Sequence, residues 1–413
     1  MPDKKISRRE FLAKSAAGAA AVAFGTAGGL APSRAMGAND RMSIGVIGVG
    51  GRGFSLMNEL DRADKERATE VTAICDTWRP RREMVAQKVN DRYGADCRTF
   101  SDYEDLLALG DIDAVIIATP DFAHARIMID ALKAGKDIYV EKPMATNLED
   151  AKEAFDAAAV SDRVVQVGTQ RRSSGIWKGA AKAVQSGVLG KISRVEIGWN
   201  DCKPRWLRGY SDVKEEDVNW KRYLMDLPYR PFDPKQYKLW HFYRDFTNGT
   251  IALLGSHYID VVAWLMNAPF PRTAVANGGH YVWDDGREHE DTLYAIYDYP
   301  EGFACRYASG LGNSAESGCR IYGTNGMFSE SGFKITGAGG KGNNVVKEEM
   351  KIEPEAGEDH MRNWLDCIRS RKTPNAPVEA GYQHSIACVM GYQALITGRK
   401  MRYMLDLRRI VEV

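Results

Sequence analysis

The sequence carries almost no excess of charge of either sign. Its 56 lysine and arginine residues are offset by 55 aspartate and glutamate residues, so the formal net charge is +1. It contains no basic stripe with interleaved aromatic residues, and no acidic or polybasic tail. This balance argues against nucleic acid as a partner and against attachment to a membrane through a basic patch.

The cysteines have no regular spacing in the sequence. The seven cysteines are scattered along the chain without a C-x-x-C pair. An odd, scattered set is not a disulfide framework, and no metal site is predicted from it. We expect buried thiols, with a single disulfide as the alternative in an oxidising compartment. The chain also has no internal repeat.

The overall composition is that of a soluble globular protein, with 44% hydrophobic and 27% charged residues. A chain of 413 residues is too long for one ordinary core, so we expect two domains. The patterns described below place the first over residues 41–168 and the second over residues 169–413.

Residues 1–40 have the pattern of an export signal rather than of a folded domain. Residues 7–12, Ser-Arg-Arg-Glu-Phe-Leu, match the twin-arginine pattern, and residues 15–32 are free of charge and rich in alanine and glycine. Residues 33–35, Ser-Arg-Ala, form a small-x-small cleavage site. A transmembrane anchor is the alternative, but alanine and glycine make a poor membrane helix. We predict a signal cleaved near Ala35, a periplasmic or otherwise exported protein, and no membrane segment in the mature form.

A glycine-rich turn lies in residues 42–53, after the first predicted strand. Gly48, Gly50 and Gly53 form G-x-G-x-x-G where a strand passes into a helix. This pattern supplies a tight turn, close backbone approach to a pyrophosphate and tight helix–strand packing. The free N–H groups at the start of the helix would face the phosphates. The motif predicts a dinucleotide site, although such a motif alone can be only a turn.

An acidic residue ends the second predicted strand. Asp76 lies at the distance from the glycine motif at which a carboxylate binds the ribose hydroxyls of NAD and repels the 2′-phosphate of NADP. A helix cap is the alternative role for this side chain. Arg79, Arg81 and Arg82 follow closely and would tolerate NADP. We therefore predict NAD as the cofactor and keep NADP as an alternative.

Two further predicted strands end in residues suited to chemistry. The strand over residues 113–118 runs into the loop of residues 119–124, at the edge of a parallel sheet where nucleotides bind. Another strand begins at Asp137 and ends in Glu141-Lys142-Pro143. Because proline keeps the preceding residue extended, we expect the side chain of Lys142 to project from the sheet edge.

The second half of the chain has a different pattern. Segments such as residues 273–282, 292–299 and 302–311 alternate like antiparallel strands, which predicts a second domain built on a large sheet. The insert, which we define as residues 201–246, is rich in tryptophan, tyrosine, proline and arginine. Its aromatic residues suit either a sugar-stacking wall or a dimer contact.

A predicted helix over residues 251–266 carries a candidate catalytic histidine. Leu253, His257, Asp260 and Trp264 have the spacing of one helical stripe. A carboxylate one turn from a histidine can fix its tautomer. A core histidine paired with a neighbour on its own helix is the alternative.

Taken in order, these motifs resemble the Gfo/Idh/MocA family of glucose–fructose oxidoreductase, inositol dehydrogenase and rhizopine-catabolism proteins. The order is the glycine fingerprint, the Asp-ended strand, Ala-Thr-Pro-x-x-x-His, Glu-Lys-Pro, Gly-x-Gln-x-Arg and Gly-x-His-x-x-Asp, and the resemblance covers about residue 41 to the end. It implies a Rossmann domain plus a C-terminal α/β domain with a large open, mostly antiparallel sheet. It also implies NAD or NADP, a carbohydrate or cyclitol substrate, and a homodimer or homotetramer packed through the open sheet.

The resemblance also implies roles for individual residues. Lys142 would hydrogen-bond the reacting hydroxyl and His257 would exchange its proton, with Asp260 as the third catalytic candidate. The implied cofactor-binding residues are Gly48, Gly50, Gly51, Arg52, Gly53, Asp76, Thr119, Pro120, Asp121, His124, Glu141, Lys142 and Gln170. The candidate substrate-binding residues are Arg172, Trp240, Arg244 and His257.

One position departs from the family's pattern. Its dehydrogenases commonly carry aspartate four residues before the histidine, and this chain has Leu253 there. Asp260 and Asp245 are the candidates to replace that carboxylate. The leading hypothesis is an oxidoreductase acting on a secondary hydroxyl with a retained cofactor. The alternatives are a glycoside hydrolase that uses bound NAD transiently, as some family relatives do, and a non-catalytic sugar-binding protein.

Overall fold

The computed structural model describes residues 41–66, 68–94 and 96–413. The predicted export signal, residues 1–40, lies outside the described residues. Within the described ranges, no helix combines the length and the apolar character needed to cross a membrane.

The N-terminal domain is built on a six-stranded sheet in the order β3-β2-β1-β4-β5-β6, and all of its pairings are parallel. The central strands are nearly continuous in apolar residues because helices cover both faces; all four residues of β4 are buried. This Rossmann arrangement confirms the predicted fold of the first domain. In sheet order the strands are β3 (Arg98–Phe100), β2 (Thr69–Cys75), β1 (Met42–Ile47), β4 (Ala114–Ile117), β5 (Asp137–Val140) and β6 (Val165–Val167).

The helices of this domain connect successive strands, as parallel pairing requires. The chain order changes direction between β1 and β4, which is the switch point where ligands bind in such sheets. The helices are α2 (Gly51–Ala63), α3 (Arg79–Tyr93), α4 (Tyr103–Leu107), α5 (His124–Lys133) and α6 (Leu148–Ala159).

The C-terminal domain carries a ten-stranded sheet in the order β14-β13-β12-β11-β7-β10-β9-β8-β15-β16. Of its described pairings, only β7 with β10 is parallel, which confirms the predicted large, mostly antiparallel sheet. The strands are β7 (Ile192–Asn200), β8 (Thr273–Gly279), β9 (Thr292–Tyr299), β10 (Phe303–Gly310), β11 (Gly318–Gly323), β12 (Gly326–Ser329), β13 (Lys334–Thr336), β14 (Met350–Lys351), β15 (Met401–Met404) and β16 (Arg409–Glu412).

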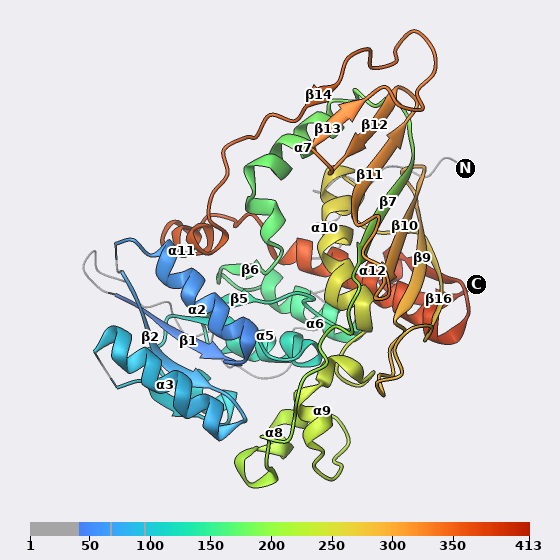
Figure 1. Ribbon diagram of the computed structural model, residues 1–413. Helices are drawn as coiled ribbons and strands as arrows, with labels where there is room; N and C mark the ends of the chain where they lie inside the picture. Colours follow the sequence, from blue (N-terminus) through green and yellow to red (C-terminus); the bar gives the residue numbers. More distant parts are fainter. Residues whose placement is uncertain (1–40, 67, 95) are drawn as a thin grey trace.

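One face of this sheet is covered and the other is open. Helices α10 (Ser256–Leu265) and α12 (Val378–Thr397) pack on it, and α7 (Gly175–Gln185) packs against α10 (Figure 1). Residues of β9 alternate between buried and exposed, as a strand with one solvated face should. Tyr294 and Ile296 point to the open side and are 53% and 47% exposed.

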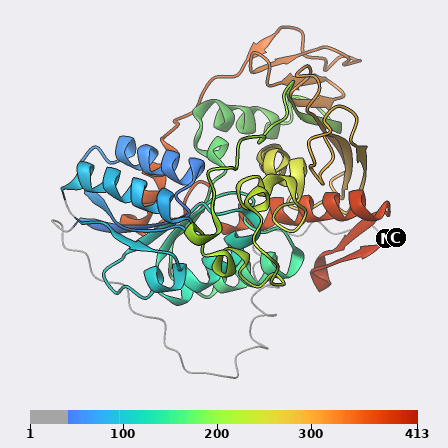
Figure 2. The same ribbon diagram turned by 60° about the horizontal axis from the view of Figure 1, so that its bottom comes forward.

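The insert consists of short helices and turns. It contains α8 (Trp220–Leu224) and α9 (Pro234–Lys238), together with 3₁₀ turns η3 (Glu215–Asp217) and η4 (Trp240–Phe242). Its own apolar cluster is completed by Phe246. Figure 1 shows α8 and α9 extending from the junction of the two domains, and Figure 2 brings this segment to the front.

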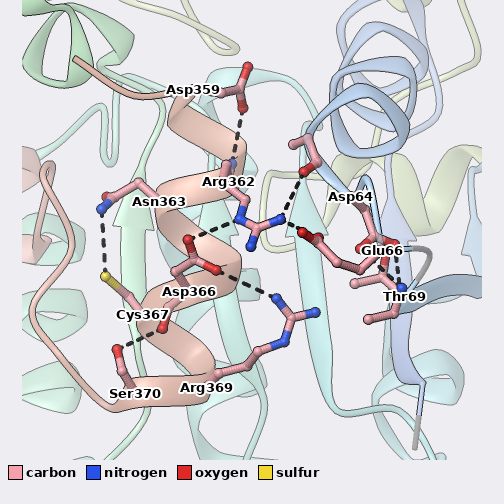
Figure 3. Close-up of polar contacts among 12 residues, drawn as sticks. Asp64, Glu66, Thr69, Asp359, Arg362, Asn363, Asp366, Cys367, Arg369 and Ser370 are labelled. Carbon is pink, nitrogen blue, oxygen red and sulfur yellow. Dashed lines mark hydrogen bonds and ion pairs between the residues drawn. The ribbon is translucent and has the colours of Figure 1, made fainter. Parts of the chain in front are cut away.

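Helix α11 (His360–Ser370) returns to the N-terminal domain, although it belongs to the C-terminal half of the chain. Its buried residues Trp364 and Leu365 join the apolar cluster of β1, β2 and α2. Figure 3 shows the polar edge of this contact, where the Arg362 guanidinium pairs with Glu66 just after α2 and donates to Asp366 at 2.9 Å. The two halves of the sequence are therefore not independent packing units.

Candidate active site

A cavity of about 870 Å³ opens at the carboxyl ends of the Rossmann strands, between the N-terminal domain, the insert and the start of α10. This is the edge at which parallel α/β sheets bind nucleotides. Most of the predicted site residues line it: Gly48, Gly50, Gly51, Arg52, Asp76, Thr119, Pro120, Asp121, His124, Glu141, Lys142, Gln170, Trp240 and His257.

The glycine loop has the geometry that its sequence predicts. Gly48 has a φ of 83°, which favours glycine. A Cβ on Gly53 would lie 1.9 Å from the Gly48 carbonyl oxygen, so only glycine lets α2 pack this closely on the turn. Gly50 and Gly51 are exposed, and a Cβ on either would meet no protein atom within 4 Å. Their backbone is open to a phosphate group at the start of α2.

Asp76 is tied to the glycine loop and to the start of α3. Its carboxylate accepts hydrogen bonds from Val49 N at 2.9 Å and from Trp78 N at 3.0 Å. Burial raises the pKa of Asp76, and these two bonds oppose the rise. The side chain therefore both orders the turn before α3 and faces the cavity in which ribose hydroxyls would lie.

Arg79, Arg81 and Arg82, the three arginines for which NADP was kept as an alternative, each have a partner within the protein. Arg81 donates to the carbonyl oxygens of Val49 (2.6 Å) and Gly50 (3.1 Å). Arg82 donates to the backbone oxygen of Asp76 at 2.6 Å, and Arg79 pairs with Asp217 of the insert.

Glu141 is a buried carboxylate held from several sides. It accepts from Arg52 Nε at 2.7 Å, from Lys142 N at 3.2 Å and from Gln170 Nε2 at 3.4 Å. A Cβ on Gly168 would lie 2.8 Å from the Glu141 Oε1 atom, so the glycine makes room for the carboxylate. Glu141 thus fixes the backbone from which the next side chain, Lys142, reaches the cavity.

Lys142 contacts the element that carries His257. Its Nζ donates to the Leu253 carbonyl oxygen at 2.7 Å. The predicted continuous helix over residues 251–266 is instead a π-helical turn over Ile251–Gly255 followed by α10. Such π-turns are frequent at functional sites. The family's aspartate position thus contributes a backbone acceptor for the lysine rather than a carboxylate.

His257 is half-buried on the cavity wall. Its imidazole lies beside the indole of Trp199, with ring centroids 5.6 Å apart, and it has no hydrogen-bond partner among the described residues. Burial, together with the positive charges of Lys142 and Arg171, lowers the pKa of His257 well below its usual value. The imidazole is therefore neutral at pH 7 and can accept a proton.

Asp260 does not partner His257, and the prediction that it would fix this histidine is wrong. Its carboxylate is fully buried and accepts two hydrogen bonds from Arg172 Nε, both at 2.9 Å. Neither Asp260 nor Arg172 lines the cavity, and the two side chains form an ion pair with each other. Arg172 is therefore not placed to bind substrate there.

Arg244 and Asp245 also lie away from the cavity. Arg244 is exposed and pairs with Glu290 at 3.0 Å, while Asp245 pairs with Arg230 at 2.6 Å. Neither of the two acids proposed to replace the missing aspartate reaches His257. The structure thus leaves the side of the imidazole near residue 253 without a carboxylate.

The loop after β4 forms another part of the cavity wall. Both ring nitrogens of His124 face carbonyl oxygens, of Pro143 at 2.8 Å and of Thr119 at 2.9 Å, which ties this loop to the turn after Lys142. Asp121 is buried and accepts from the Thr247 hydroxyl at 2.7 Å. The Thr119 hydroxyl is buried without a partner among the described residues, as expected of a wall completed by a bound molecule.

The insert supplies the predicted Trp240 and several cavity residues that were not predicted from the sequence. Trp240 and Trp206 both stack on His241, with ring centroids 3.7 Å and 5.2 Å apart. The only signal in the sequence was the aromatic density of the insert, which did not show which side chains face inward. The further cavity residues from β7 and the insert are Trp199, Arg205, Trp206, Arg208, Arg222, Tyr223, Met225, Tyr237, Lys238 and His241.

No group of three histidine, cysteine, aspartate or glutamate side chains converges as metal ligands would in the part of the chain that the structure describes. All seven cysteines are free thiols, and five of them are buried.

Comparisons with known proteins identify the two domains. Residues 42–169 match "Oxidoreductase family, NAD-binding Rossmann fold", and residues 181–403 match "Oxidoreductase family, C-terminal alpha/beta domain", both of the Gfo/Idh/MocA group. The exposed backbone of the glycine loop, the Asp76 carboxylate and the unpartnered Thr119 hydroxyl fit the binding of NAD. NAD is therefore the cofactor of the N-terminal domain.

Two relatives illustrate the range of similarity. The inositol 2-dehydrogenase/D-chiro-inositol 3-dehydrogenase of Lactiplantibacillus plantarum is 29% identical over 202 residues, which are 47% of this chain and 56% of that protein. A glycosyl hydrolase family 109 protein of a Shewanella species is 36% identical over 132 residues, 30% of this chain and 27% of that protein. The matched part thus spans about half the length of the inositol dehydrogenase, and less of the hydrolase.

Among solved structures, the WlbA dehydrogenase from Bordetella pertussis in complex with NADH and UDP-GlcNAcA superposes with a TM-score of 0.65. It shares 21% identity, and the match covers 88% of this chain and 98% of that one. At this identity the likeness establishes the fold.

Proposed function

This chain belongs to the Gfo/Idh/MocA oxidoreductase family, and from this premise we propose that it oxidises or reduces a secondary hydroxyl carbon of a sugar, sugar derivative or cyclitol. The observation that carries the proposal is that Lys142 and His257 line the same cavity as the glycine loop. Similarity to an inositol dehydrogenase supports a polyol-like substrate.

The protein's own residues would handle the hydroxyl proton. Bound NAD supplies the acceptor for the hydride that leaves the carbinol carbon. An ammonium group has three N–H donors, and Lys142 gives one to the Leu253 carbonyl oxygen, so two remain for a substrate hydroxyl. The neutral imidazole of His257 would accept the hydroxyl proton as general base.

The aromatic wall suits a carbohydrate. Sugar rings present apolar C–H faces together with hydroxyl groups, so they pack on aromatic rings and hydrogen-bond at their edges. Trp199, Trp206 and Trp240 supply such rings beside His257 and His241. We assign these side chains to the substrate end of the cavity.

We propose further that the protein is exported and keeps its cofactor through a catalytic cycle. The twin-arginine pattern of residues 7–12 supports export, and this route carries folded proteins. A free nicotinamide pool is not expected outside the cytoplasm. Oxidation of one sugar would then be balanced by reduction of another, with no net change in the bound dinucleotide.

A redox-neutral glycoside hydrolase is the second candidate. Similarity to a family 109 glycosyl hydrolase and the leucine at position 253 favour it. In such a cycle the sugar is oxidised at C3, the aglycone is eliminated across C1–C2, water adds, and the C3 ketone is reduced again. Oxidation and reduction cancel, which also suits an exported enzyme.

An assay with purified protein separates these candidates. Sugars and cyclitols are offered as hydride donors, and the nicotinamide absorbance band is followed with and without an added sugar acceptor. An oxidoreductase reduces its nicotinamide on the right donor and is reoxidised by the acceptor. Release of nitrophenol from nitrophenyl glycosides, without added NAD and without net nicotinamide change, would instead establish the hydrolase.

We also propose a homodimer or homotetramer that packs through the open face of the ten-stranded sheet. Exposed apolar side chains on that face, such as Val275, Tyr294 and Ile296, support this contact. Light scattering of the wild type and of the Ile296→Lys variant tests it. A monomeric wild type would contradict the proposal.

A further inference from the structure

We propose that the insert, residues 201–246, is the outer half of the dinucleotide site and retains the cofactor by fastening itself to the loops that bind the adenosine end. This inference rests on the proposed function, because it explains how an exported enzyme would keep its NAD. The insert belongs to the C-terminal half of the chain, yet it contacts the loops after β2, β3 and β4.

The strongest attachment is to the turn that follows the ribose acid. Asn219 N donates to the Thr77 carbonyl oxygen at 2.9 Å, and Trp78 pairs with Val218 as an isolated antiparallel bridge. The Lys238 ammonium lies 4.1 Å from the centroid of the Trp78 ring. Backbone pairing and cation–π contact thus fix the insert directly beside Asp76.

Tyr237 contacts the ribose acid itself. Its hydroxyl donates to the Asp76 Oδ1 atom at 3.3 Å, and its ring meets Trp78 edge-on with centroids 6.4 Å apart. Tyr223 packs on Tyr237, with ring centroids 4.8 Å apart, and its hydroxyl is buried without a partner among the described residues. All four side chains line the cavity. The insert therefore covers the place where the ribose hydroxyls would meet Asp76.

The other attachments lie on the next two loops of the same edge. Arg222 pairs with Asp102 after β3 at 2.5 Å. After β4, Phe122 N donates to the Phe246 carbonyl oxygen at 3.2 Å, and the two rings lie 5.3 Å apart. A dinucleotide in the cavity would thus lie between the glycine loop and the insert, and its adenosine end could leave only after these contacts open.

Arg208 places a positive charge in the cavity wall. It lines the cavity, donates from Nε to the Lys238 carbonyl oxygen at 3.0 Å, and has no carboxylate partner among the described residues. A cation left unpaired in the wall of a dinucleotide cavity complements an anionic ligand. The insert thereby offers both a cover and a positive charge.

The test measures dinucleotide release rather than turnover. Protein loaded with NADH is mixed with excess NAD, and the loss of bound-NADH fluorescence gives the dissociation rate. Tyr237→Phe removes only the hydroxyl that bonds Asp76, and Tyr229→Phe is the matched control because Tyr229 is 74% exposed on the same insert. We expect release about ten-fold faster in Tyr237→Phe and unchanged in Tyr229→Phe.

A second variant tests whether the other contacts of the insert compensate for the loss of the Tyr237 hydroxyl. Asp217→Asn removes the partner of Arg79, so Asp217→Asn/Tyr237→Phe should release NADH faster than either single variant. Release from the double variant at the wild-type rate would overturn the inference while leaving the proposed function intact. Failure of the wild type to bind any dinucleotide would overturn both.

Discussion

The cavity has two walls, one from the Rossmann domain and one from the insert and α10, and different kinds of contact fix their positions. The Rossmann wall consists of residues that end parallel strands, such as Asp76 after β2 and Lys142 after β5, so their positions follow directly from the sheet. The opposite wall, from the insert and α10, depends on contacts between residues far apart in sequence. The Rossmann wall is thus fixed by local pattern, and the other wall by tertiary packing.

This difference explains why the prediction that placed Lys142 in the site is correct, whereas the one that placed Asp260 there is wrong. Lys142 reaches the cavity because the strand before it ends at the binding edge. Asp260 has helical spacing from His257, but the pairing with Arg172 turns it into the core. Sequence spacing therefore predicts a site residue only where the element that carries it already faces the site.

The largest expected effect is on the Rossmann wall. Replacing Lys142 by methionine removes the donor for the reacting hydroxyl, so kcat should fall about 1,000-fold while NADH still binds. Steady-state kinetics and NADH fluorescence check both halves of this expectation. Lys133→Met, on an exposed part of α5, is the control and should keep full activity. Near-normal kcat in Lys142→Met would remove the lysine from the proposed chemistry.

The buried pair behind the other wall comes next. Arg172→Met leaves the Asp260 carboxylate buried and unpaired, so the free energy of unfolding should fall by about 3 kcal/mol. Arg194→Met, at a 57% exposed side chain with a loose ion pair, should cost less than about 1 kcal/mol. Urea unfolding measures both. An active-site role for Arg172 would be indicated if stability held but KM rose sharply.

Two glycine-to-alanine substitutions, one in the glycine loop and one outside it, allow a similar comparison. A Cβ on Gly53 would meet the Gly48 carbonyl oxygen at 1.9 Å, whereas one on Gly110 would meet nothing within 4 Å. Gly53→Ala should therefore lower the free energy of unfolding by about 2 kcal/mol and weaken NADH binding, while Gly110→Ala should do neither. Equal behaviour of the two variants in urea unfolding and NADH titration would refute the close-packing argument.

The last comparison concerns the joint between the halves of the chain and uses the pH dependence of stability. Burial lowers the pKa of His360 from 6.5 to about 4, and its Nε2 atom lies 3.0 Å from the Val167 carbonyl oxygen. In the unfolded chain, His360 is protonated below about pH 6.5. In the folded chain, it stays neutral until about pH 4. The stabilising effect of neutral His360 is therefore complete above pH 6.5 and is lost as the pH falls toward 4.

Unfolding free energies measured from pH 7 to pH 4 check this sign. The His360→Gln variant should lose less stability over this window, by about 1.4 kcal/mol per pH unit. His280→Gln, at an exposed histidine, should follow the wild-type curve. A His360→Gln curve parallel to that of the wild type would show that His360 does not contribute to the acid sensitivity.

The fold could be predicted because its signals are local and repeated. Apolar runs ending in Asp76, Thr119 and Lys142 mark parallel strands, and alternation marks the large sheet. The return of Trp364 to the N-terminal core and the attachment of Tyr237 to Asp76 carry no local signal, because they depend on where distant segments meet. The π-helical turn before α10 could not be predicted either, because its sequence is compatible with an ordinary α-helix.

The roles proposed for the cavity depend on a bound dinucleotide, which can be detected in the purified protein. The full-length protein is expressed, purified without added cofactor and denatured, and the released small molecules are identified by mass spectrometry. We expect NAD or NADH at close to one molecule per chain. A protein that releases no dinucleotide, and binds none when NADH is added to the native form, would contradict this expectation.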